Sequence, residues 1–334
     1  MKISASIYST DRPLQEVVKE LDAHRIDYFH VDCNDDVRVF EDIKKIREWS
    51  TTPIDLHIIS STPEKYFDLL RETPVDYVTF QHEDLKSKLV LPAEIKARKG
   101  LAITANSDIT VFDEYADNFD FMLMMATIPG KSGGSFNKDI FRKIREFKRR
   151  YPTKRIHVDG GVNGEVSFIL RNMGVYASVS GSYLFKAESL GFALLNLKTY
   201  ENESHFTIRD FMLNNGEIPV LAEHEASFES ILKTIDNYQL GFVMLSDAEG
   251  RLAGISSNAD IRKGLIKHFA KLPHIPVQEI INTQPVTISE SATVIELLRL
   301  IKSKNFPISY LPVINDQGQI SGALTFINLI KGEA

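Results

Sequence analysis

The chain has 334 residues, with 39 lysines and arginines against 45 aspartates and glutamates, and a formal net charge of −6. This length exceeds what one hydrophobic core usually fills and predicts two domains. The acidic balance, with basic residues spread along the chain, argues against a nucleic-acid-binding surface, and no apolar stretch is long enough to span a bilayer. Cys33 is the only cysteine, which excludes intrachain disulfides and predicts a cytoplasmic location.

Up to about residue 200, short β-branched or aromatic runs alternate with amphipathic segments. The predicted strands are 3–8, 28–33, 54–59, 77–80, 101–104, 119–125, 155–158 and 177–179. The predicted helices are 14–23, 37–49, 63–71, 139–150, 166–172 and one after Tyr183. This alternation is typical of a (β/α)8 barrel, the TIM barrel, or of a long doubly wound parallel sheet.

Polar side chains collect at the carboxyl ends of the predicted strands. His30 and Asp32 stand two residues apart on one strand and therefore share a face, while His57 and Asp159 close two other strands. In a parallel α/β architecture this end of the sheet binds ligands. Two histidines and two aspartates suit zinc, iron(II) or manganese, so the pattern predicts a metal site. The alternative to a metal ligand, for each of these residues taken alone, is a polar side chain that is hydrogen-bonded to its neighbours at a strand end.

Glycines recur at the ends of the later predicted strands. They lie in the segment 129–135, at Gly160 and Gly161, and at Gly181 before Ser182. Glycine lets backbone N–H groups approach an anion, and the last two strand–helix loops of a (β/α)8 barrel commonly bind phosphate. These turns therefore predict a phosphate site, although glycines that only shape turns are an equal alternative.

With these residues assembled, the first 200 positions resemble ribulose-phosphate 3-epimerases. The resemblance runs in order through nearly the whole segment, by the motifs Ser4-Ala5-Ser6-Ile7, His30-Val31-Asp32, Asp55-Leu56-His57, Thr79-Phe80, Gly100-Leu101-Ala102, Pro129-Gly130 with Gly133, Val158-Asp159-Gly160-Gly161 and Gly181-Ser182-Tyr183-Leu184-Phe185-Lys186.

The resemblance implies one divalent metal (Zn, Fe(II), Mn or Co) held by His30, Asp32, His57 and Asp159. It implies epimerisation at C3 of a ketose phosphate, with D-ribulose 5-phosphate to D-xylulose 5-phosphate as the default. Asp32 would remove the proton and Asp159 would return one on the opposite face, through a metal-stabilised enediolate. The segment 129–136 would close over the substrate. The implied substrate-binding residues are Ser6, His57, Gly133, Gly134, Gly160, Gly161, Gly181 and Ser182.

Several positions depart from the family pattern around this implied site. They are Asn34 and Asp36 after the second strand, Ile59, Gln81 where a histidine is usual, Thr104-Ala105, and Lys131-Ser132 in the closing loop. These changes leave the four metal positions intact and alter the pocket. Two alternatives to the default reaction therefore stay open. The chain could be an epimerase of a different sugar phosphate, or a non-catalytic sensor of sugar phosphate and nucleotide.

An internal repeat marks the C-terminal part of the chain. The segment 247–254 recurs as 316–322, since 318 − 250, 322 − 254 and 328 − 260 all equal 68. A repeat of this length predicts two copies of one supersecondary unit packed together.

Both copies resemble CBS domains, paired α+β modules that bind adenine nucleotides and regulate attached enzymes. The resemblance rests on the segments 254–260 and 322–328, and it implies nucleotide contacts from Ser257, Asn258, Asp260 and Thr325. Asn328 replaces the motif aspartate in the second copy. The segments 208–212 and 217–219 look like the CBS pair appended to arabinose-5-phosphate isomerases.

The predicted domains are therefore a barrel over 1–200 and a tandem CBS pair over 205–334, with copies at 205–268 and 273–334. The expected partners are a phosphorylated ketose, an adenine nucleotide and a second copy of the chain, in a dimer or higher homo-oligomer. A structural or dimerising module without a ligand is the alternative for the CBS pair.

Overall fold

The computed structural model describes residues 1–131, 133–199, 206–269 and 275–326. The chain divides into two compact units, Met1–Asn202 and Glu203–Ile330. Ser132 and Asn328, two of the positions where the sequence departs from its family patterns, lie outside the described residues.

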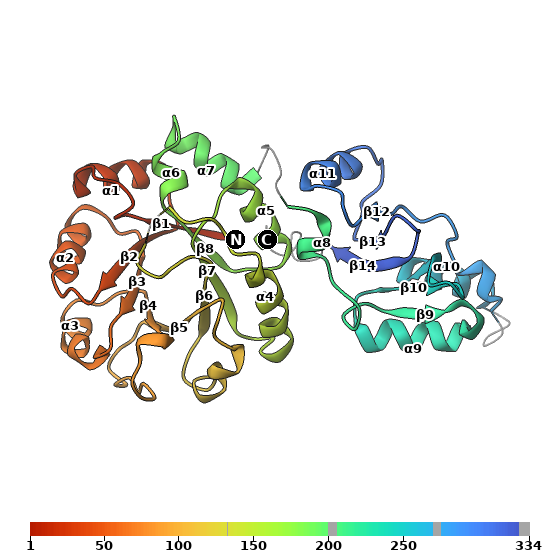
Figure 1. Cartoon of the computed structure of the whole chain (residues 1–334), viewed down its shortest axis with the longest axis horizontal. Helices are drawn as coiled ribbons and strands as arrows, with labels where there is room; N and C mark the ends of the chain where they lie inside the picture. The colour runs from red at the N-terminus through yellow and green to blue at the C-terminus, as the bar shows by residue number, and fades with distance from the viewer. Residues whose placement is uncertain (132, 200–205, 270–274, 327–334) are drawn as a thin grey trace. The chain divides into compact units, whose positions relative to one another are not determined.

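The first unit is a closed barrel of parallel strands, coloured from red to green in Figure 1. Each strand pairs with the next along the chain, and β1 pairs with β8 to close the ring. This closure confirms the (β/α)8 prediction and excludes the doubly wound sheet. The strands are β1 (Lys2–Ser6), β2 (Tyr28–Asn34), β3 (Ile54–Ile59), β4 (Tyr77–Gln81), β5 (Arg98–Thr104), β6 (Phe121–Met125), β7 (Arg155–Asp159) and β8 (Ala177–Ser180).

Helices and 3₁₀ turns connect these strands, and the helices surround the barrel (Figure 1). The connection from β4 to β5 and the one from β5 to β6 contain the 3₁₀ turns η2 and η3. The connecting elements are α1 (Leu14–Ala23), α2 (Val39–Trp49), η1 (Pro63–Tyr66), α3 (Phe67–Glu72), η2 (His82–Asp84), η3 (Ile109–Glu114), α4 (Asp139–Arg150) and α5 (Gly164–Asn172), followed after β8 by α6 (Ser182–Phe185) and α7 (Leu190–Thr199).

The inside of the barrel is apolar at the amino ends of the strands. A buried cluster there contains Tyr28, Tyr77 and Phe121, and His157 stacks on Phe121 with ring centroids 4.1 Å apart. Side chains alternate along a strand, so the next inward position of β2 after Tyr28 is His30. The packed floor therefore supports the polar side chains above it at the carboxyl ends of the strands.

The second unit contains two three-stranded sheets, ordered β11-β10-β9 and β12-β13-β14. In each copy two strands pair in parallel and the last pair is antiparallel. The register repeats too, because Leu245 lies opposite Gly254 and Val313 lies opposite Gly322, each 68 positions later. The sequence repeat is therefore a structural repeat, as a tandem CBS pair requires.

The elements of the second unit follow one another with the same alternation in both copies. They are α8 (Ile208–Phe211), β9 (Val220–Ala222), η4 (Glu223–Glu225), α9 (Phe228–Tyr238), β10 (Phe242–Ser246), β11 (Leu252–Ser257) and α10 (Asn258–Lys267), then η6 (Val277–Glu279), β12 (Ile288–Ser289), α11 (Val294–Lys302), β13 (Tyr310–Ile314) and β14 (Ile320–Thr325).

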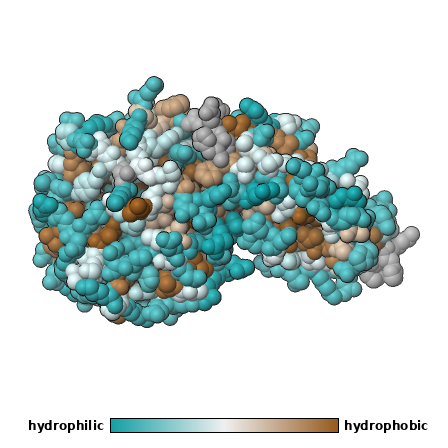
Figure 2. Space-filling model, viewed as in Figure 1, coloured by the Kyte–Doolittle hydropathy of each residue, from teal (hydrophilic) through white to brown (hydrophobic). Residues whose placement is uncertain are grey.

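On the face shown in Figure 2, exposed hydrophobic side chains form separate small patches among hydrophilic residues. Isolated exposed hydrophobic residues of this kind are normal for a folded domain. None of the helices in the described part of the chain combines the length and the hydropathy needed to cross a membrane.

Candidate metal centre and adjoining pocket

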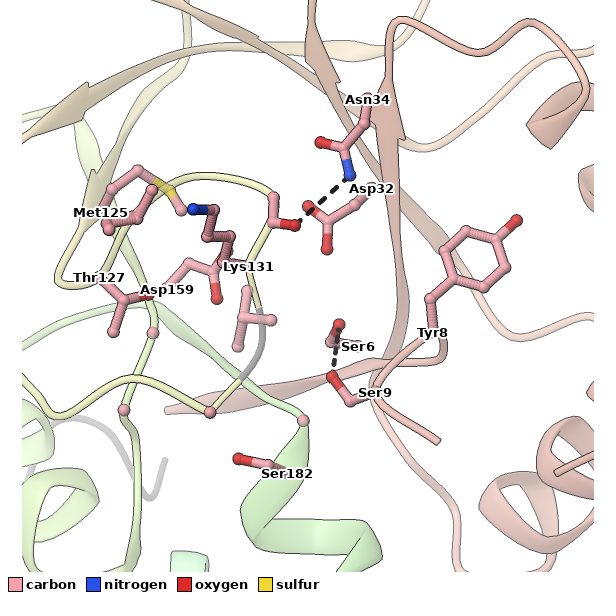
Figure 3. A pocket seen from close by; sticks show the side chains of 17 residues that line it. Ser6, Tyr8, Ser9, Asp32, Asn34, Met125, Thr127, Lys131, Asp159 and Ser182 are labelled. Atoms are coloured by element: carbon pink, nitrogen blue, oxygen red, sulfur yellow. Dashed lines mark hydrogen bonds between the residues drawn. The ribbon is translucent and has the colours of Figure 1, made fainter. Parts of the chain in front are cut away.

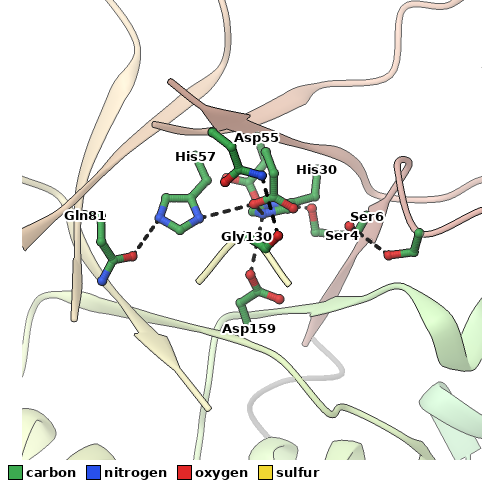
Figure 4. A network of polar contacts seen from close by, with 11 residues as sticks. Ser4, Ser6, His30, Asp55, His57, Gln81, Gly130 and Asp159 are labelled. Atoms are coloured by element: carbon green, nitrogen blue, oxygen red, sulfur yellow. Dashed lines mark hydrogen bonds and ion pairs between the residues drawn. The ribbon is translucent and has the colours of Figure 1, made fainter. Parts of the chain in front are cut away.

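Four side chains from three strands of the barrel meet at the carboxyl end of the ring (Figure 4). His30 and Asp32 come from β2, His57 from β3 and Asp159 from β7, and one potential ligand atom of each lies within 4.8 Å of all the others. The closest approaches are 3.3 Å from His30 Nε2 to Asp32 Oδ1, 3.3 Å from His57 Nδ1 to Asp32 Oδ1, and 3.6 Å from His30 Nε2 to Asp159 Oδ2.

Strand register explains why β2 and β3 bring their polar residues together. Asp32 pairs with His57, and His30 pairs with Asp55 one layer below. Because side chains alternate along each strand, all four residues point into the barrel. Neighbouring strands therefore supply two polar layers, one for the centre and one beneath it.

The lower layer fixes the ring of His30. Its Nδ1 donates to Asp55 Oδ2 at 2.9 Å, since an ionised carboxylate only accepts, and the same oxygen accepts a hydrogen bond from Ser4 Oγ at 3.0 Å. The other ring nitrogen, Nε2, then faces the centre. A carboxylate behind a ligating histidine is the usual support of a metal site.

The centre leaves three buried polar atoms without a hydrogen-bond partner among the described residues. They are His30 Nε2, Asp32 Oδ1 and His57 Nδ1. Buried polar atoms without partners cost free energy, so such a group indicates a ligand. Two imidazole nitrogens and two carboxylates match the donor set of zinc, iron(II), manganese or cobalt, so these residues fit a divalent cation.

The ionisable groups are strongly coupled in this buried site. Burial alone would lower the pKa of His30, but the carboxylates of Asp32 and Asp55 outweigh burial and raise it. Burial would raise the pKa of Asp32, yet the electrostatic attraction of His30, whose Nε2 lies 3.3 Å from Asp32 Oδ1, lowers it. Burial raises the pKa of Asp159 to about 6, an effect that His30 opposes and Asp32 reinforces. The carboxylates around His30 therefore favour positive charge at the centre, which a divalent cation would supply.

A pocket of about 300 Å³ opens beside the centre, and Asp32 and Asp159 both line it (Figure 3). Most of the predicted substrate-binding residues also line it: Ser6, Gly133, Gly160, Gly161, Gly181 and Ser182. Gly134 and His57 are not among the lining residues, and His57 is fully buried. The predicted metal ligands and the predicted phosphate turns therefore adjoin one cavity.

Two glycines of this rim occupy positions where another residue would be strained. Gly160 has φ +103°, and a Cβ there would lie 2.1 Å from Thr127 Oγ1. Gly130 has φ +68°, and a Cβ there would lie 2.2 Å from Asn34 Oδ1. Asn34 Nδ2 also donates to the carbonyl of Gly130 at 3.5 Å. Asn34, one of the positions that depart from the family pattern, therefore contacts the segment that contains Gly130 beside the pocket.

A cavity of about 840 Å³ lies in the second unit and includes the first CBS motif. Ser257, Asn258 and Asp260 line it, together with Arg262 and Tyr310, whereas Thr325 does not. Asp260 Oδ2 accepts a hydrogen bond from the backbone N–H of Ser257, and Ser257 Oγ accepts one from the backbone N–H of Asp260, so the two residues form a capping box at the start of α10. The hydroxyl of Ser257 also donates to Asp260 Oδ2.

Sequence reasoning did not assign a role to Asp55 or Glu83, and it noted Gln81 only as a departure. The strand period offers a signal for Asp55, which lies two residues before His57 and so shares its face. Glu83 lies in η2, beyond the end of β4, where strand periodicity gives no guide.

Catalytic residues of (β/α)8 barrels lie at the carboxyl ends of the strands, so the fold and the site define an enzyme of this barrel class. A family model described as the ribulose-phosphate 3 epimerase family matches residues 2–185, more than half of the chain, and a CBS domain model matches residues 277–333. The chain belongs to the ribulose-phosphate 3-epimerase family and is an isomerase of the carbohydrate epimerase type that also contains a CBS domain.

Two relatives illustrate the similarity of the barrel. Ribulose-phosphate 3-epimerase of Methanocaldococcus jannaschii is 29% identical over 216 residues, which cover 59% of this chain and 90% of that protein. Ribulose-phosphate 3-epimerase of Bacillus subtilis is 26% identical over 200 residues, which cover 55% of this chain and 92% of that protein.

Two solved structures are similar to part of the chain. The CBS-pair protein CBSX2 from Arabidopsis thaliana has 21% identity and a TM-score of 0.32, over 38% of this chain and 94% of that chain. The CBS domain pair of MJ0100, in complex with 5′-methylthioadenosine and S-adenosyl-L-methionine, has 21% identity and a TM-score of 0.32, over 39% of this chain and all of that chain.

Proposed function

We propose that the chain epimerises a ketose phosphate at C3, with D-ribulose 5-phosphate to D-xylulose 5-phosphate as the default reaction. The observation that carries this proposal is the pair of carboxylates, Asp32 and Asp159, which line one pocket from separate strands (Figure 3). Both carboxylates also lie next to the two buried histidines, His30 and His57. Inversion at a carbon next to a ketone requires two proton-transfer groups, and membership of the epimerase family supports that chemistry.

In this proposal Asp32 removes the proton from C3, and the electron pair moves to the ketone oxygen to give an enediolate. Asp159 then donates a proton to the opposite face of C3, and the ketone forms again. His30, Asp32, His57 and Asp159 would hold one divalent cation (Zn, Fe(II), Mn or Co), which supplies electrostatic stabilisation of negative charge on oxygen. Closure of the loop 129–136 would exclude water from the enediolate.

The phosphate of the substrate is proposed to bind at the glycine-rich end of the pocket. The proposed contacts are Ser6, Gly133, Gly134, Gly160, Gly161, Gly181 and Ser182, most of which line the cavity. Backbone N–H groups at such turns bind anions because no side chain blocks their approach.

A panel of ketose phosphates tests the substrate. Conversion followed by NMR should give D-ribulose 5-phosphate the highest kcat/KM, while a tenfold preference for another sugar would contradict the default. A different sugar phosphate stays the second candidate because Asn34 and Lys131, both departures from the family pattern, line the pocket. The non-catalytic sensor is not favoured, since the chain belongs to an epimerase family.

For the second unit we propose that an adenine nucleotide binds and regulates the enzyme, with contacts from Ser257, Asn258, Asp260 and Thr325. A cavity of about 840 Å³, lined in part by the first three of these residues, supports the proposal because its volume is that of a small-molecule site. Thr325 lies outside that lining and would belong to a second site.

Other expectations from the sequence stay predictions. They are the homo-oligomeric state, the cytoplasmic location, the resemblance of the CBS pair to that of arabinose-5-phosphate isomerases, and the domain boundaries 1–200, 205–268 and 273–334.

A further inference from the structure

Glu83 is surrounded by hydrogen-bond donors at the end of β4. Its Oε1 accepts from the backbone N–H and the hydroxyl of Thr104, each at 2.8 Å, and from the hydroxyl of Ser107. Its Oε2 accepts from Gln81 Nε2. Burial alone would raise the pKa of Glu83, but the hydrogen bonds from Ser107, Thr104 and Gln81 lower it. Glu83 is therefore an ionised carboxylate, which can only accept.

This carboxylate gives the amide of Gln81 a single orientation. Gln81 is buried, with 1% of its surface exposed, and its Nε2 must face Glu83 because two acceptors would repel one another. Its Oε1 then faces His57 Nε2, at 2.9 Å (Figure 4). An amide oxygen only accepts, so His57 Nε2 carries the proton.

The protonation of Nε2 leaves the other ring nitrogen of His57 without a hydrogen. That nitrogen, Nδ1, lies 3.3 Å from Asp32 Oδ1, and neither atom has a hydrogen-bond partner among the described residues. Two acceptors at this distance are unfavourable unless a cation lies against both. The tautomer of His57 therefore suits the centre for a metal ion.

We propose that Gln81 and Glu83 are positioning residues that hold His57 in its Nε2–H tautomer, so that the lone pair of Nδ1 is directed at the centre. This inference deepens the proposed function and depends on the same candidate centre. The hydrogen bonds run from Glu83 through Gln81 to His57. Each one determines which atom of the next group carries its hydrogen.

The two histidines of the centre are thus supported in different ways. Asp55 places a full negative charge directly against the ring of His30, whereas the neutral amide of Gln81 separates His57 from the charge of Glu83. A carboxylate raises the basicity of its histidine, and an amide fixes orientation with less effect on basicity. Gln81 thus orients His57 without adding a fourth carboxylate next to the four proposed ligands.

The test is ¹⁵N NMR of the full chain, labelled at histidine and freed of metal, with the His57 signal assigned from a His57→Asn variant. The wild type should show His57 as the Nε2–H tautomer. Gln81→Leu removes the acceptor, so Nδ1 should gain the proton and donate it to Asp32. Zn²⁺ affinity, measured against a competing chelator, should fall about 10–100-fold in Gln81→Leu.

Three further variants separate positioning from mere packing. Glu83→Gln frees the amide of Gln81 to turn, and should shift the tautomer in the same direction by a smaller amount. Gln81→His can donate to Glu83 through one ring nitrogen and accept from His57 at the other, and should restore the wild-type tautomer. Thr79→Val is the matched control, because Thr79 lies on the same strand and its buried hydroxyl has no hydrogen-bond partner among the described residues.

A wild-type His57 in the Nδ1–H form would overturn the proposal. So would a wild-type tautomer and Zn²⁺ affinity in both Gln81→Leu and Glu83→Gln, and the second variant decides if the first does not fold. Both measurements are made without substrate. A failure of the chain to epimerise any ketose phosphate would contradict the proposed function and leave this result standing.

Discussion

The barrel and the second unit each contain carboxylates in motifs expected to bind a ligand. The two regions differ in whether those carboxylates have hydrogen-bond partners within the protein. In the barrel, Asp32 Oδ1 faces two histidine nitrogens, and all three atoms are buried without a hydrogen-bond partner among the described residues. In the second unit, Asp260 accepts two hydrogen bonds from Ser257 within a capping box.

The barrel centre therefore has polar atoms that need a ligand, whereas the carboxylate of the CBS motif already has hydrogen-bond partners within the protein. Leaving three buried polar atoms unpaired costs several kcal/mol, about 1–3 for each atom, which a bound cation would offset. The capping box of α10 stabilises the helix start by about 1 kcal/mol whether or not a nucleotide binds. The barrel motif therefore indicates a ligand more strongly than the CBS motif does.

The largest expected effect is the loss of epimerisation in Asp159→Asn. An amide cannot donate the proton as a carboxylic acid does, so kcat should fall by about 10²–10⁴-fold. A steady-state assay with D-ribulose 5-phosphate measures this change. The control is Glu296→Gln, because Glu296 is a capping carboxylate of α11 that accepts from Thr293.

Glu296→Gln should leave kcat within about twofold and lower stability by about 1 kcal/mol at most. A folded, metal-loaded Asp159→Asn protein with full activity would show that Asp159 is not the acid.

The next effect is a pH dependence confined to the barrel. Burial lowers the pKa of His157 to about 4, and the same histidine in the unfolded chain has a pKa of about 6.5. Between these values the unfolded chain binds a proton that the folded barrel does not. Barrel stability should therefore fall as the pH drops from about 6.5 to about 4, by up to about 3 kcal/mol.

Urea unfolding of wild type and His157→Phe across this pH range measures the effect. The phenylalanine can stack on Phe121 as His157 does and has no charge to gain. Equal pH slopes for the two proteins would contradict the assignment to His157.

A divalent cation should stabilise the barrel and leave the second unit unchanged. A hundredfold excess over the dissociation constant adds about 2.7 kcal/mol of stability. Differential scanning calorimetry of chelator-treated protein, with and without Zn²⁺ or Mn²⁺, should show the shift in one transition only. In His30→Gln the shift should be lost, and an equal shift there would place the cation elsewhere.

The smallest expected effect is stabilisation of the second unit by an adenine nucleotide. At a tenfold excess over the dissociation constant, the gain is about 1.4 kcal/mol. Thermal melting of the full chain with millimolar AMP or ATP measures it. Arg262→Ala should weaken the shift because Arg262 lines the cavity. If no adenine nucleotide shifts the melting temperature, a structural or dimerising role of the second unit would be favoured.

Strand periodicity was sufficient to predict the parallel strands, but it left a closed barrel and a doubly wound sheet as alternatives. The predicted runs at 54–59 and 77–80 correspond to β3 (Ile54–Ile59) and β4 (Tyr77–Gln81). The boundaries were less accurate where the chain turns tightly, since the predicted helix 63–71 is a 3₁₀ turn followed by α3. The closing pair of β1 and β8 could not be predicted, because the register of a barrel depends on residues far apart in the sequence.

For the site, the sequence could identify the residues at strand ends but not their supporting contacts. His30 and Asp55 are 25 positions apart, and their hydrogen bond follows from the register of β2 against β3. The orientation of Gln81 depends on Glu83, whose place in η2 comes from a turn with no periodic signal. Long-range register and turn geometry thus account for what the sequence left open.

Deuterium incorporation from D₂O is the most direct test of the account. The full chain, loaded with Zn²⁺, Mn²⁺, Fe(II) or Co²⁺, would be incubated with D-ribulose 5-phosphate and other ketose phosphates and followed by NMR. We predict deuterium at C3 of the product, because Asp159 exchanges its proton with solvent before donating it. No deuterium at C3 of any ketose phosphate, with any of these metals, would contradict the proposed epimerisation.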